Sequence, residues 1–254
     1  MREKAYAKIN VFLKITGYKD GYHTLLSRFI KVKELYDTIS FKPQKCNSFT
    51  IEGCGDILVE DNIIYKSYIA IKEYINNPSV VEKFFQNHKV VVQKRIPSGA
   101  GLGGGSSNGA TFMRLLNRVC KLNIPTDRLA QIGSKIGADI PFFIYNYDSA
   151  NVRGFGEIVE EFKEEPLNVK LYTPNIHCNT AIVYKTFKDN LLNKIDLLSF
   201  QDWESLTSKE ILTKVDATMA NDLYKASLIA YPELKNVAKK GWYFSGSGST
   251  FFKN

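Results

Sequence analysis

The stretch from Pro97 to Gly109, PSGAGLGGGSSNG, decides how this 254-residue chain is interpreted. Glycine at every second position or closer lets the backbone turn its N–H groups toward one point. A helix predicted from residue 107 onward adds the positive end of its dipole and unpaired N–H groups. The stretch therefore predicts a phosphate-binding loop, to which Ser106 and Ser107 contribute hydroxyls. A flexible linker is disfavoured, because the stretch lies between a Val-Val-Val strand and an amphipathic helix.

Two known phosphate-loop patterns fit this stretch poorly. The Walker pattern needs a lysine followed by serine or threonine, and that lysine is absent. Gly99, Gly101 and Gly104 formally satisfy the dinucleotide fingerprint G-x-G-x-x-G. That fingerprint belongs to an early strand–helix–strand unit, whereas this loop follows nearly 100 residues of chain. A dinucleotide-binding domain is therefore disfavoured.

The composition is that of a folded soluble protein, with 44% hydrophobic and 24% charged residues. It excludes intrinsic disorder, a collagen-like repeat and a disulfide-stapled mini-protein. The formal net charge of +8 points to an anionic partner and leaves nucleic acid, a membrane surface and phosphorylated small molecules open.

The cysteines and the N-terminus bear on the cellular compartment. The four cysteines lie far apart without a C-x-x-C pair, which disfavours a zinc site or a redox motif. No apolar run approaches the roughly 18 residues that a membrane helix needs. Arg2, Glu3 and Lys4 leave no room for the apolar part of a signal peptide. We therefore expect a cytoplasmic protein with reduced thiols that does not enter a membrane.

The first part of the chain reads as strands followed by helices. Residues 5–15 alternate apolar and polar, which predicts a half-buried strand, and Asp20-Gly21 predicts a tight turn after it. Further strands are predicted at Phe29–Val32, Thr38–Phe41 and Lys89–Gln93. Helices are predicted over 61–76, capped by Asp61 or Asn62, over 107–121, and from Pro125 to Gly137. This order indicates a mixed α and β domain without a regular parallel series.

The polar stretch from Phe162 to Asn168 is the most plausible domain boundary. Beyond it, strands are predicted at Val169–Thr173, Ala181–Tyr184 and Trp242–Phe244, and a helix over 219–230. The last of these strands enters a second glycine cluster, SGSGST, at residues 245–250.

The glycine loop resembles the second motif of the GHMP kinases, which phosphorylate galactose, homoserine, mevalonate and phosphomevalonate. Other segments match the same family in the same order. They are Ala7-Lys8-Ile9-Asn10, Asp20-Gly21-Tyr22-His23, Gly137-Ala138-Asp139-Ile140-Pro141-Phe142-Phe143 and Ser245-Gly246-Ser247-Gly248-Ser249-Thr250. The ordered set spans residues 7 to 250, and the Gly-Gly-Gly-Ser-Ser-Asn form points to a branch whose substrate carries cytidine diphosphate.

The resemblance implies an α+β fold of two domains. Residues 1–164 would form an ATP-binding N-terminal domain like the second domain of ribosomal protein S5, and residues 165–254 a shortened ferredoxin-like C-terminal domain. The implied activity is ATP-dependent phosphorylation of the 2-hydroxyl of a cytidine diphosphate ester of methylerythritol, with Mg²⁺, in isoprenoid precursor synthesis. The metal ligands and the oligomeric state stay open.

The resemblance also implies which residues bind ATP. The loop that would hold the triphosphate consists of Pro97, Ser98, Gly99, Ala100, Gly101, Leu102, Gly103, Gly104, Gly105, Ser106 and Ser107. Asn62 and Lys94 match family positions near the adenine nucleotide.

Asp139 and Lys8 match the family's catalytic pair. Asp139 follows a predicted helix stop, where a carboxylate either caps a helix or does chemistry. The resemblance makes it the base that deprotonates the alcohol. Composition alone favours a surface position for Lys8, whereas the resemblance has Lys8 polarise the alcohol and so lower the pKa of its hydroxyl. Asn10, two residues on, lies on the same face about 7 Å away and would hydrogen-bond the substrate.

Tyr22, His23 and Tyr184 match the cytosine-binding positions of the same branch. The Tyr22 ring would stack on the base, His23 would hydrogen-bond its edge, and Tyr184 would supply a second ring. For Tyr184 an alternative stays open, in which the tyrosine ends a core strand.

The chain departs from the family pattern at Gly109, where alanine is usual, and after Thr250, where family members usually continue through another strand and helix. The departure at Gly109 would loosen the first helical turn by about 1 kcal/mol. The second departure would require the C-terminal domain to be closed differently.

Two alternatives remain at the level of sequence. One is a GHMP kinase for another small alcohol, such as homoserine or mevalonate. The other is a basic RNA-binding protein that uses an S5-like fold. The second is disfavoured, because the chain has neither a dense Lys/Arg tract nor an aromatic RNA-binding motif. We therefore expect small-molecule substrates and no nucleic acid.

Overall fold

A computed structural model of the chain describes residues 1–55 and 57–254. The chain combines helices and strands, as predicted. By their contacts the residues form two compact units. Unit 1 comprises Met1–Ala7, Lys33–Ile96 and Gly104–Asn146, and unit 2 comprises Lys8–Val32, Pro97–Gly103 and Tyr147–Asn254. The predicted division into domains at residues 164 and 165 stays a prediction.

The N-terminal strand β1 runs from Arg2 to Lys19 and includes the predicted strand over 5–15. Its apolar face is at most 3% exposed, as the alternation predicts; it consists of Ala5, Ala7, Ile9, Val11, Leu13 and Ile15. In unit 2 the other face is buried as well. Phe12 packs edge-on against Trp203 at 5.3 Å between ring centroids, and Lys14 pairs with Asp222. Because residues from the C-terminal part cover this face, the strand is buried on both faces from Lys8 to Ile15 rather than half-buried.

The turn after β1 confirms the prediction at Asp20-Gly21, where φ is 52° and 86°. Strand β2 then runs without a break from Tyr22 to Pro43 and contains both strands predicted in this region. In unit 1 its C-terminal part pairs antiparallel with β4 (His88–Gln93), and in unit 2 its N-terminal part pairs antiparallel with β5 (Ser149–Gly154).

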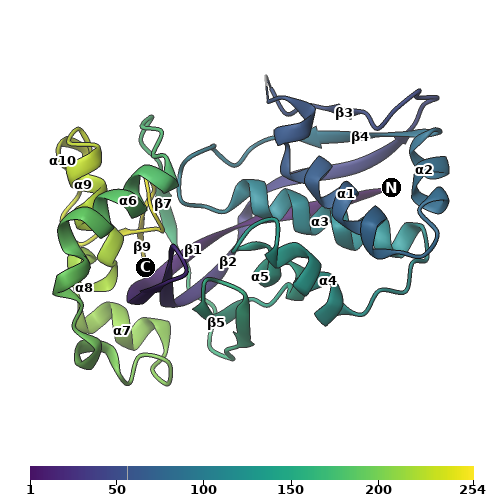
Figure 1. The fold of residues 1–254 in the computed structure, drawn as a ribbon. Helices are drawn as coiled ribbons and strands as arrows, with labels where there is room; N and C mark the ends of the chain where they lie inside the picture. The colour runs from purple at the N-terminus through teal and green to yellow at the C-terminus, as the bar shows by residue number, and fades with distance from the viewer. Residues whose placement is uncertain (56) are drawn as a thin grey trace. The chain divides into compact units, whose positions relative to one another are not determined.

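Unit 1 is a sheet with helices on one face, as Figure 1 shows for α1, α3, α4 and α5. The short strand β3 (Ile51–Glu52) lies parallel to β4. The other elements are η1 (Val59–Asp61), α1 (Ile63–Tyr74), α2 (Ser79–Phe85), α3 (Gly104–Val119), α4 (Thr126–Ser134) and α5 (Ile140–Tyr145). The rings of Phe41 on β2, Phe85 on α2 and Phe112 on α3 contact one another with centroids 5.4–5.9 Å apart, and each residue is at most 2% exposed.

The helices of unit 1 follow the prediction with shifted ends. Asn62 caps α1, because its side chain accepts a hydrogen bond from Ile64 N at 2.9 Å. Helix α3 begins at Gly104 instead of residue 107, inside the glycine cluster. Helix α4 ends at Ser134, three residues before the predicted stop at Gly137.

Gly109 lies where α3 packs closely against α1. A Cβ at this position would lie 2.6 Å from Cγ2 of Ile63 and 3.1 Å from the Ser67 hydroxyl. The glycine therefore serves close helix packing here, and its lower helix propensity is not the deciding property.

We expect Gly109→Ala to lower the free energy of unfolding by about 1–3 kcal/mol, because overpacking outweighs the gain of about 1 kcal/mol in helix propensity. Urea unfolding measures this change. Ile63→Ala removes the obstructing methyl, so in that background Gly109→Ala should stabilise. A loss of the same size in both backgrounds would contradict the packing argument.

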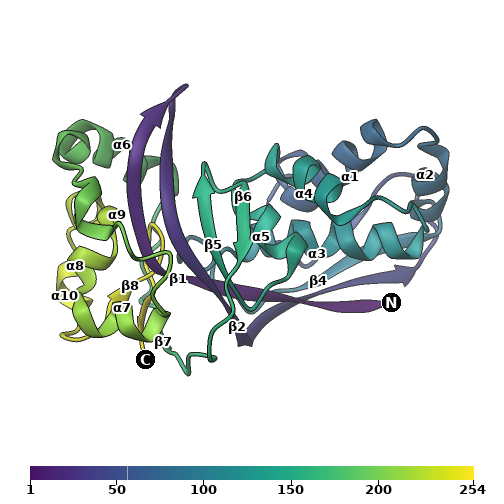
Figure 2. The same ribbon diagram turned by 90° about the horizontal axis from the view of Figure 1, so that it is seen from below.

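Unit 2 contains two small groups of strands. Strand β5 pairs antiparallel with β6 (Ile158–Glu161), beside β2 in Figure 2. A separate antiparallel sheet has the order β7-β9-β8, with β7 at Lys170–Tyr172, β8 at Tyr243–Phe244 and β9 at Phe251–Lys253. The predicted strands at Val169–Thr173 and Trp242–Phe244 are thereby confirmed.

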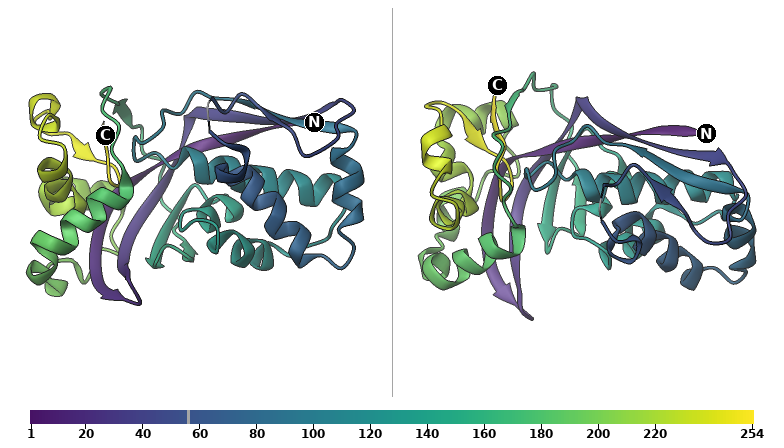
Figure 3. Two further views of the ribbon diagram at one scale, coloured as in Figure 1. Left: turned by 45° about the horizontal axis from the view of Figure 1, so that its top comes forward. Right: turned by 90° about the horizontal axis from the view of Figure 1, so that it is seen from above.

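The C-terminal part of unit 2 is mainly helical, and its green and yellow helices gather beside the yellow strands in Figure 3. The elements are α6 (Thr180–Leu191), η2 (Leu192–Lys194), η3 (Leu197–Phe200), α7 (Ser208–Lys214), α8 (Ala217–Ala220), α9 (Asp222–Ala230) and α10 (Leu234–Val237). Helices α8 and α9 confirm the helix predicted over 219–230. Cys178, Tyr224, Leu234, Phe244 and Phe251 form a buried apolar cluster here.

The predicted strand at Ala181–Tyr184 is wrong, because these residues belong to α6. The Asn179 side chain caps this helix by accepting a hydrogen bond from Ile182 N at 3.2 Å. Val183 and Phe187, four residues apart, form its buried side at 0% and 3% exposure. Capping and packing thus override the strand preference of the local Ile-Val-Tyr run.

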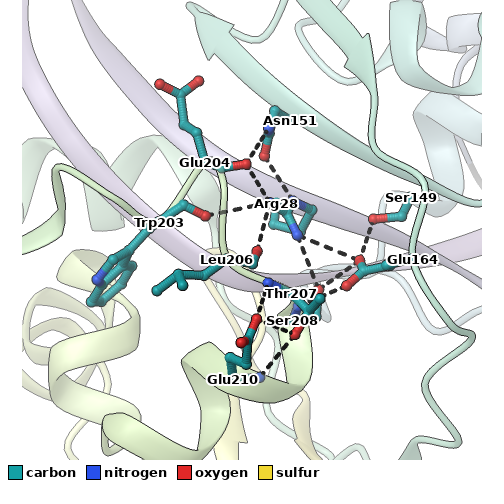
Figure 4. A network of polar contacts seen from close by, with 10 residues as sticks. All are labelled: Arg28, Ser149, Asn151, Glu164, Trp203, Glu204, Leu206, Thr207, Ser208 and Glu210. Atoms are coloured by element: carbon teal, nitrogen blue, oxygen red, sulfur yellow. Dashed lines mark hydrogen bonds and ion pairs between the residues drawn. The ribbon is translucent and has the colours of Figure 1, made fainter.

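A buried arginine connects β2 to distant parts of unit 2, as Figure 4 shows. Arg28 is fully buried and lies 3.4 Å from the centre of the Phe162 ring. Its guanidinium pairs with Glu164 at 3.5 Å and donates to Asn151 Oδ1 at 2.7 Å. It also donates to three backbone carbonyls, those of Trp203 (3.3 Å), Glu204 (3.0 Å) and Leu206 (3.2 Å).

Within residues 1–55 and 57–254, none of the helices has the length and apolar character needed to cross a membrane.

Candidate functional site

Residues 97–103, the part of the predicted phosphate loop (97–107) that lies in unit 2, have four successive carbonyl groups that accept hydrogen bonds from the protein. The donors are Cys178 N to Gly99 (3.0 Å), Thr250 N to Ala100 (3.1 Å), Ser245 Oγ to Gly101 (3.0 Å) and Lys8 N to Leu102 (3.0 Å). In a planar trans peptide the N–H points opposite to the C=O. The N–H groups of residues 100–103 therefore point away from these donors, as an anion-binding backbone requires.

The glycines of this loop are needed for its shape. Gly99, Gly101 and Gly103 have φ values of 64°, 73° and 69°, in the left-handed region that favours glycine. A Cβ at Gly101 would lie 2.1 Å from the carbonyl oxygen of Ser245. The second glycine cluster, residues 245–250, thus packs directly against the loop. Pro97 and Ser98, at the start of the loop, are exposed.

In unit 1, helix α3 begins at Gly104, so Gly105, Ser106 and Ser107 lie in its first turn. Ser107 is 1% exposed, and nothing in the part of the chain that the structure describes hydrogen-bonds to its buried hydroxyl. A Cβ at Gly104 would lie 3.6 Å from Nζ of Lys94. The start of α3 thus combines helix N–H groups, a buried hydroxyl and a lysine charge, which suits a phosphate group.

Lys94 is fixed by a buried carboxylate. Asp37, 0% exposed on β2, pairs with the Lys94 ammonium and accepts from Arg95 N (2.6 Å) and Ile96 N (2.8 Å). These three contacts to the Asp37 carboxylate fix the segment that follows β4. Asn62, the other residue predicted near the nucleotide, is 8% exposed and caps α1.

Asp139 lies half-buried in unit 1, directly before α5. It occupies the N-cap position, yet its side chain makes no capping hydrogen bond. Asp139 therefore does not cap the helix, which was one of the two roles that the sequence left open. A Cβ at the nearby Gly137 would lie 3.6 Å from Oγ of Ser106. Unit 1 thus places the turn that carries Asp139 next to the first turn of α3.

Lys8 and Asn10 lie together in unit 2. Lys8 is 4% exposed, so the surface position favoured by composition is wrong. Its ammonium donates to Asn10 Oδ1 at 2.6 Å and lies 4.3 Å from the centre of the Phe29 ring. A buried lysine that touches an amide and a ring is held in a single orientation.

His23 and Tyr184 also lie together in unit 2. Their ring centroids are 5.2 Å apart, and His23 further contacts Tyr18 at 5.0 Å and Phe187 at 5.6 Å. Nε2 of His23 is buried and has no hydrogen-bond partner among the described residues. Tyr22 is not in this cluster: it is 69% exposed, and its ring contacts Phe155 at 5.9 Å.

Sequence reasoning missed Tyr18, Phe187 and Asn108. Phe187 was hidden by the wrong strand assignment; as part of a helix it falls four residues after the buried Val183. Tyr18 has no motif, and it accepts a hydrogen bond from Lys188 at 2.9 Å. Asn108 is 5% exposed, and no described residue hydrogen-bonds to its Oδ1.

Burial lowers the pKa of His23 below its usual 6.5, and the positive charge of Lys188 lowers it further. Folding therefore favours the neutral ring, and its stabilising contribution is lost as the pH falls through the lowered pKa. From about pH 7 to about pH 5 we expect the free energy of unfolding to fall more for the wild type than for His23→Gln. Denaturant unfolding across this range measures the difference.

Lys188→Met provides the control, because it removes the second cause of the lowered pKa and should weaken the pH dependence without abolishing it. Identical pH dependence in the wild type and His23→Gln would show that His23 does not titrate as described.

Comparison with known proteins gives a consistent result. The family described as the GHMP kinases N terminal domain matches residues 62–147. A protein of Sulfurovum sp. (strain NBC37-1) named 4-diphosphocytidyl-2-C-methyl-D-erythritol kinase is 54% identical over 250 residues, covering 98% of this chain and 97% of that protein. A protein of the same name from Sulfurimonas denitrificans is 46% identical over 253 residues, covering 98% of this chain and 95% of that protein.

Among solved structures, a crystal structure of 4-(cytidine 5'-diphospho)-2C-methyl-D-erythritol kinase superposes with a TM-score of 0.72. The two chains are 26% identical, and the match covers 99% of this chain and 89% of the other. The predicted fold class, an α+β fold of the two-domain GHMP kinase type, is thereby confirmed.

Proposed function

Because the chain belongs to the GHMP kinase family, we propose that it transfers the γ-phosphoryl group of ATP to the 2-hydroxyl of 4-diphosphocytidyl-2-C-methyl-D-erythritol. This reaction belongs to the non-mevalonate pathway of isoprenoid precursors. The observation that carries the proposal is the 54% identity over 98% of the chain to a relative named for this activity. The phosphate loop and the buried lysine support it independently.

The loop and α3 bind the triphosphate. The N–H groups of residues 100–103, turned away from the carbonyl partners, donate to phosphate oxygens. The N-terminus of α3, with Ser106 and Ser107 in its first turn, adds further donors and the positive end of a 16-residue helix. Lys94 supplies a charge beside this turn, and Asn62, at the start of α1, lies toward the adenine.

Asp139 takes the proton of the attacking hydroxyl, and Lys8 polarises that hydroxyl. Phosphoryl transfer needs mainly positioning and charge stabilisation, with one group to accept the proton. Asp139 accepts the proton in this proposal because it matches the family's catalytic aspartate and carries a carboxylate beside the first turn of α3. Lys8 suits charge stabilisation, because its ammonium is buried and held by Asn10. Asn10 also hydrogen-bonds the substrate.

His23 and Tyr184 select the cytosine. A ring of this size stacks on an aromatic side chain, which is worth about 1–3 kcal/mol per base. Nε2 of His23, buried and without a described partner, is the atom that would hydrogen-bond the base edge. Tyr22, exposed beside Phe155, would reach the base from the outer side.

The start of α3 fits Mg²⁺. This ion takes oxygen ligands beside substrate phosphates, and in P-loop enzymes one ligand is a serine or threonine hydroxyl. The buried Ser107 hydroxyl, with no described partner, is such an oxygen. When bound with ATP, Mg²⁺ neutralises the negative charge of the phosphates. The substrates are small molecules, and we propose that the enzyme acts in the cytoplasm without nucleic acid.

The ³¹P NMR spectrum of the product tests this function. With ATP and the cytidyl substrate, we expect a new phosphomonoester resonance while the diphosphate resonances of the substrate persist. Cleavage of that diphosphate, or no new phosphomonoester, would overturn the proposed reaction.

A further inference from the structure

We propose that Ser27, on β2, is a positioning residue that fixes the amide of Asn10 and, through it, the ammonium of Lys8. The inference rests on the proposed roles of Lys8 and Asn10 in phosphoryl transfer. Ser27 is 0% exposed, and its hydroxyl accepts a hydrogen bond from Asn10 Nδ2 at 3.0 Å. The same hydroxyl donates its proton to the backbone carbonyl of Phe12.

The number of protons on the Ser27 hydroxyl decides which group donates in each of its hydrogen bonds. A serine hydroxyl has one proton, and Ser27 gives it to the Phe12 carbonyl. Toward Asn10 it can therefore only accept, so Asn10 must present its NH₂ group to Ser27. The amide oxygen of Asn10 then faces the other way, toward the Lys8 ammonium at 2.6 Å.

The reversed amide is disfavoured at both ends. It would set the Asn10 oxygen against the lone pairs of Ser27 and the NH₂ group against the Lys8 ammonium. Both contacts are buried, where a polar group left unpaired is strongly unfavourable. The Ser27 hydroxyl therefore determines that the amide oxygen of Asn10, and not its NH₂ group, faces the Lys8 ammonium.

The backbone of Asn10 has a separate anchor, which makes the effect of Ser27 specific to the side chain. Asn10 N donates to Ser245 Oγ at 3.3 Å, and that hydroxyl donates to the Gly101 carbonyl at 3.0 Å. Phe29, two residues after Ser27 on the same side of β2, lies against the Lys8 ammonium. Losing the Ser27 hydroxyl should therefore free the amide while the strand and the loop stay in place.

Steady-state kinetics of Ser27→Ala test this inference with ATP and the cytidyl substrate. We expect kcat per folded molecule to fall about 10- to 100-fold, because small errors in positioning reacting groups have effects of this size. The KM for ATP should stay within about twofold, since Ser27 contacts the Asn10 side chain and not the loop. Ser27→Thr keeps the hydroxyl and should recover most of kcat.

A double-mutant cycle separates positioning from a purely structural role. If Ser27 acts through Asn10, then Ser27→Ala should change kcat by less than about twofold in an Asn10→Ala background. Ser67→Ala is the matched control, because Ser67 is also 0% exposed and donates to a backbone carbonyl, that of Ile63 at 2.8 Å. It should leave kcat unchanged.

The outcomes are distinguishable. A kcat of Ser27→Ala within about twofold of the wild type, or an effect that multiplies with that of Asn10→Ala, would overturn the inference. Full activity of Asn10→Ala and Lys8→Ala would instead overturn the proposed roles of those residues. A reduced kcat in Ser67→Ala matching that of Ser27→Ala would show that loss of any buried hydroxyl is responsible.

Discussion

Asp139→Asn is expected to lower kcat by about 10²- to 10⁴-fold, the range that a positioned general base contributes. Asparagine keeps the size of the side chain and removes its ability to take a proton. Asp139 does not cap α5, so the substitution removes no capping hydrogen bond from that helix. We expect the reduction to appear in the chemical step, with the Kd for ATP nearly unchanged.

Rapid-quench kinetics, together with a titration of ATP binding, measure both quantities. Asp127→Asn is the matched control, because Asp127 is an exposed carboxylate that accepts a hydrogen bond from Tyr145 at 3.0 Å. We expect it to turn over like the wild type. Turnover of Asp139→Asn near that of the wild type would remove Asp139 as the base.

Arg28→Met should lower the free energy of unfolding by about 3–5 kcal/mol, the effect of breaking a buried ion pair on one side. The substitution leaves the Glu164 side chain, which is 4% exposed, without its cation. It also removes the donor to three carbonyls of residues 203–206 and to Asn151 (Figure 4). The methionine fills part of the volume, so the loss is mainly one of polar contacts.

Two further variants define the cause. Arg153→Met removes an arginine of the same unit that pairs with Glu160 and Glu204 but is 40% exposed. We expect a loss of at most about 1 kcal/mol, as for surface ion pairs. In Arg28→Met with Glu164→Gln, the stranded charge is gone and part of the stability should return. Urea unfolding of the four proteins makes the comparison.

Hydrogen exchange locates the same effect. The backbone amides of residues 203–208 should exchange faster in Arg28→Met, because their segment loses its contacts with β2. Equal losses in Arg28→Met and Arg153→Met would contradict the distinction between the buried and the exposed arginine.

The glycine loop and the N-terminal strand could be predicted because their requirements are local. Left-handed backbone at Gly99, Gly101 and Gly103 needs glycine at those positions, and a helix follows directly in the chain. The alternation of apolar and polar residues over 5–15 predicts one buried face of a strand, whichever part of the chain covers that face. The burial of the second face depends on Trp203 and Asp222, about 200 residues away, and left no local pattern.

The error at Ala181–Tyr184 has the opposite cause. Its residues favour a strand locally, while the helix is set by the Asn179 cap and by Val183 and Phe187 packing in unit 2. The same error concealed Phe187 as a ring of the His23 cluster. A side chain that functions through its neighbours cannot be recognised until the element that carries it is assigned.

The polar pair Arg28 and Glu164 shows a third case. Glu164 lies in the stretch interpreted as a boundary because it is polar and contains a proline. In the structure its side chain is 4% exposed and pairs with an arginine 136 residues away in the chain. Charge alone does not reveal burial, because a charged residue is buried only where a partner compensates it, and here that partner is distant in the chain.

A coupled assay of ADP release tests the central claim most directly. Purified protein is given ATP and, in turn, 4-diphosphocytidyl-2-C-methyl-D-erythritol, homoserine or mevalonate. We predict ADP release that depends on the cytidyl substrate and is absent with the other two alcohols. Turnover of homoserine or mevalonate with no response to the cytidyl substrate would contradict the account, as would steeply salt-dependent RNA binding without any turnover of ATP.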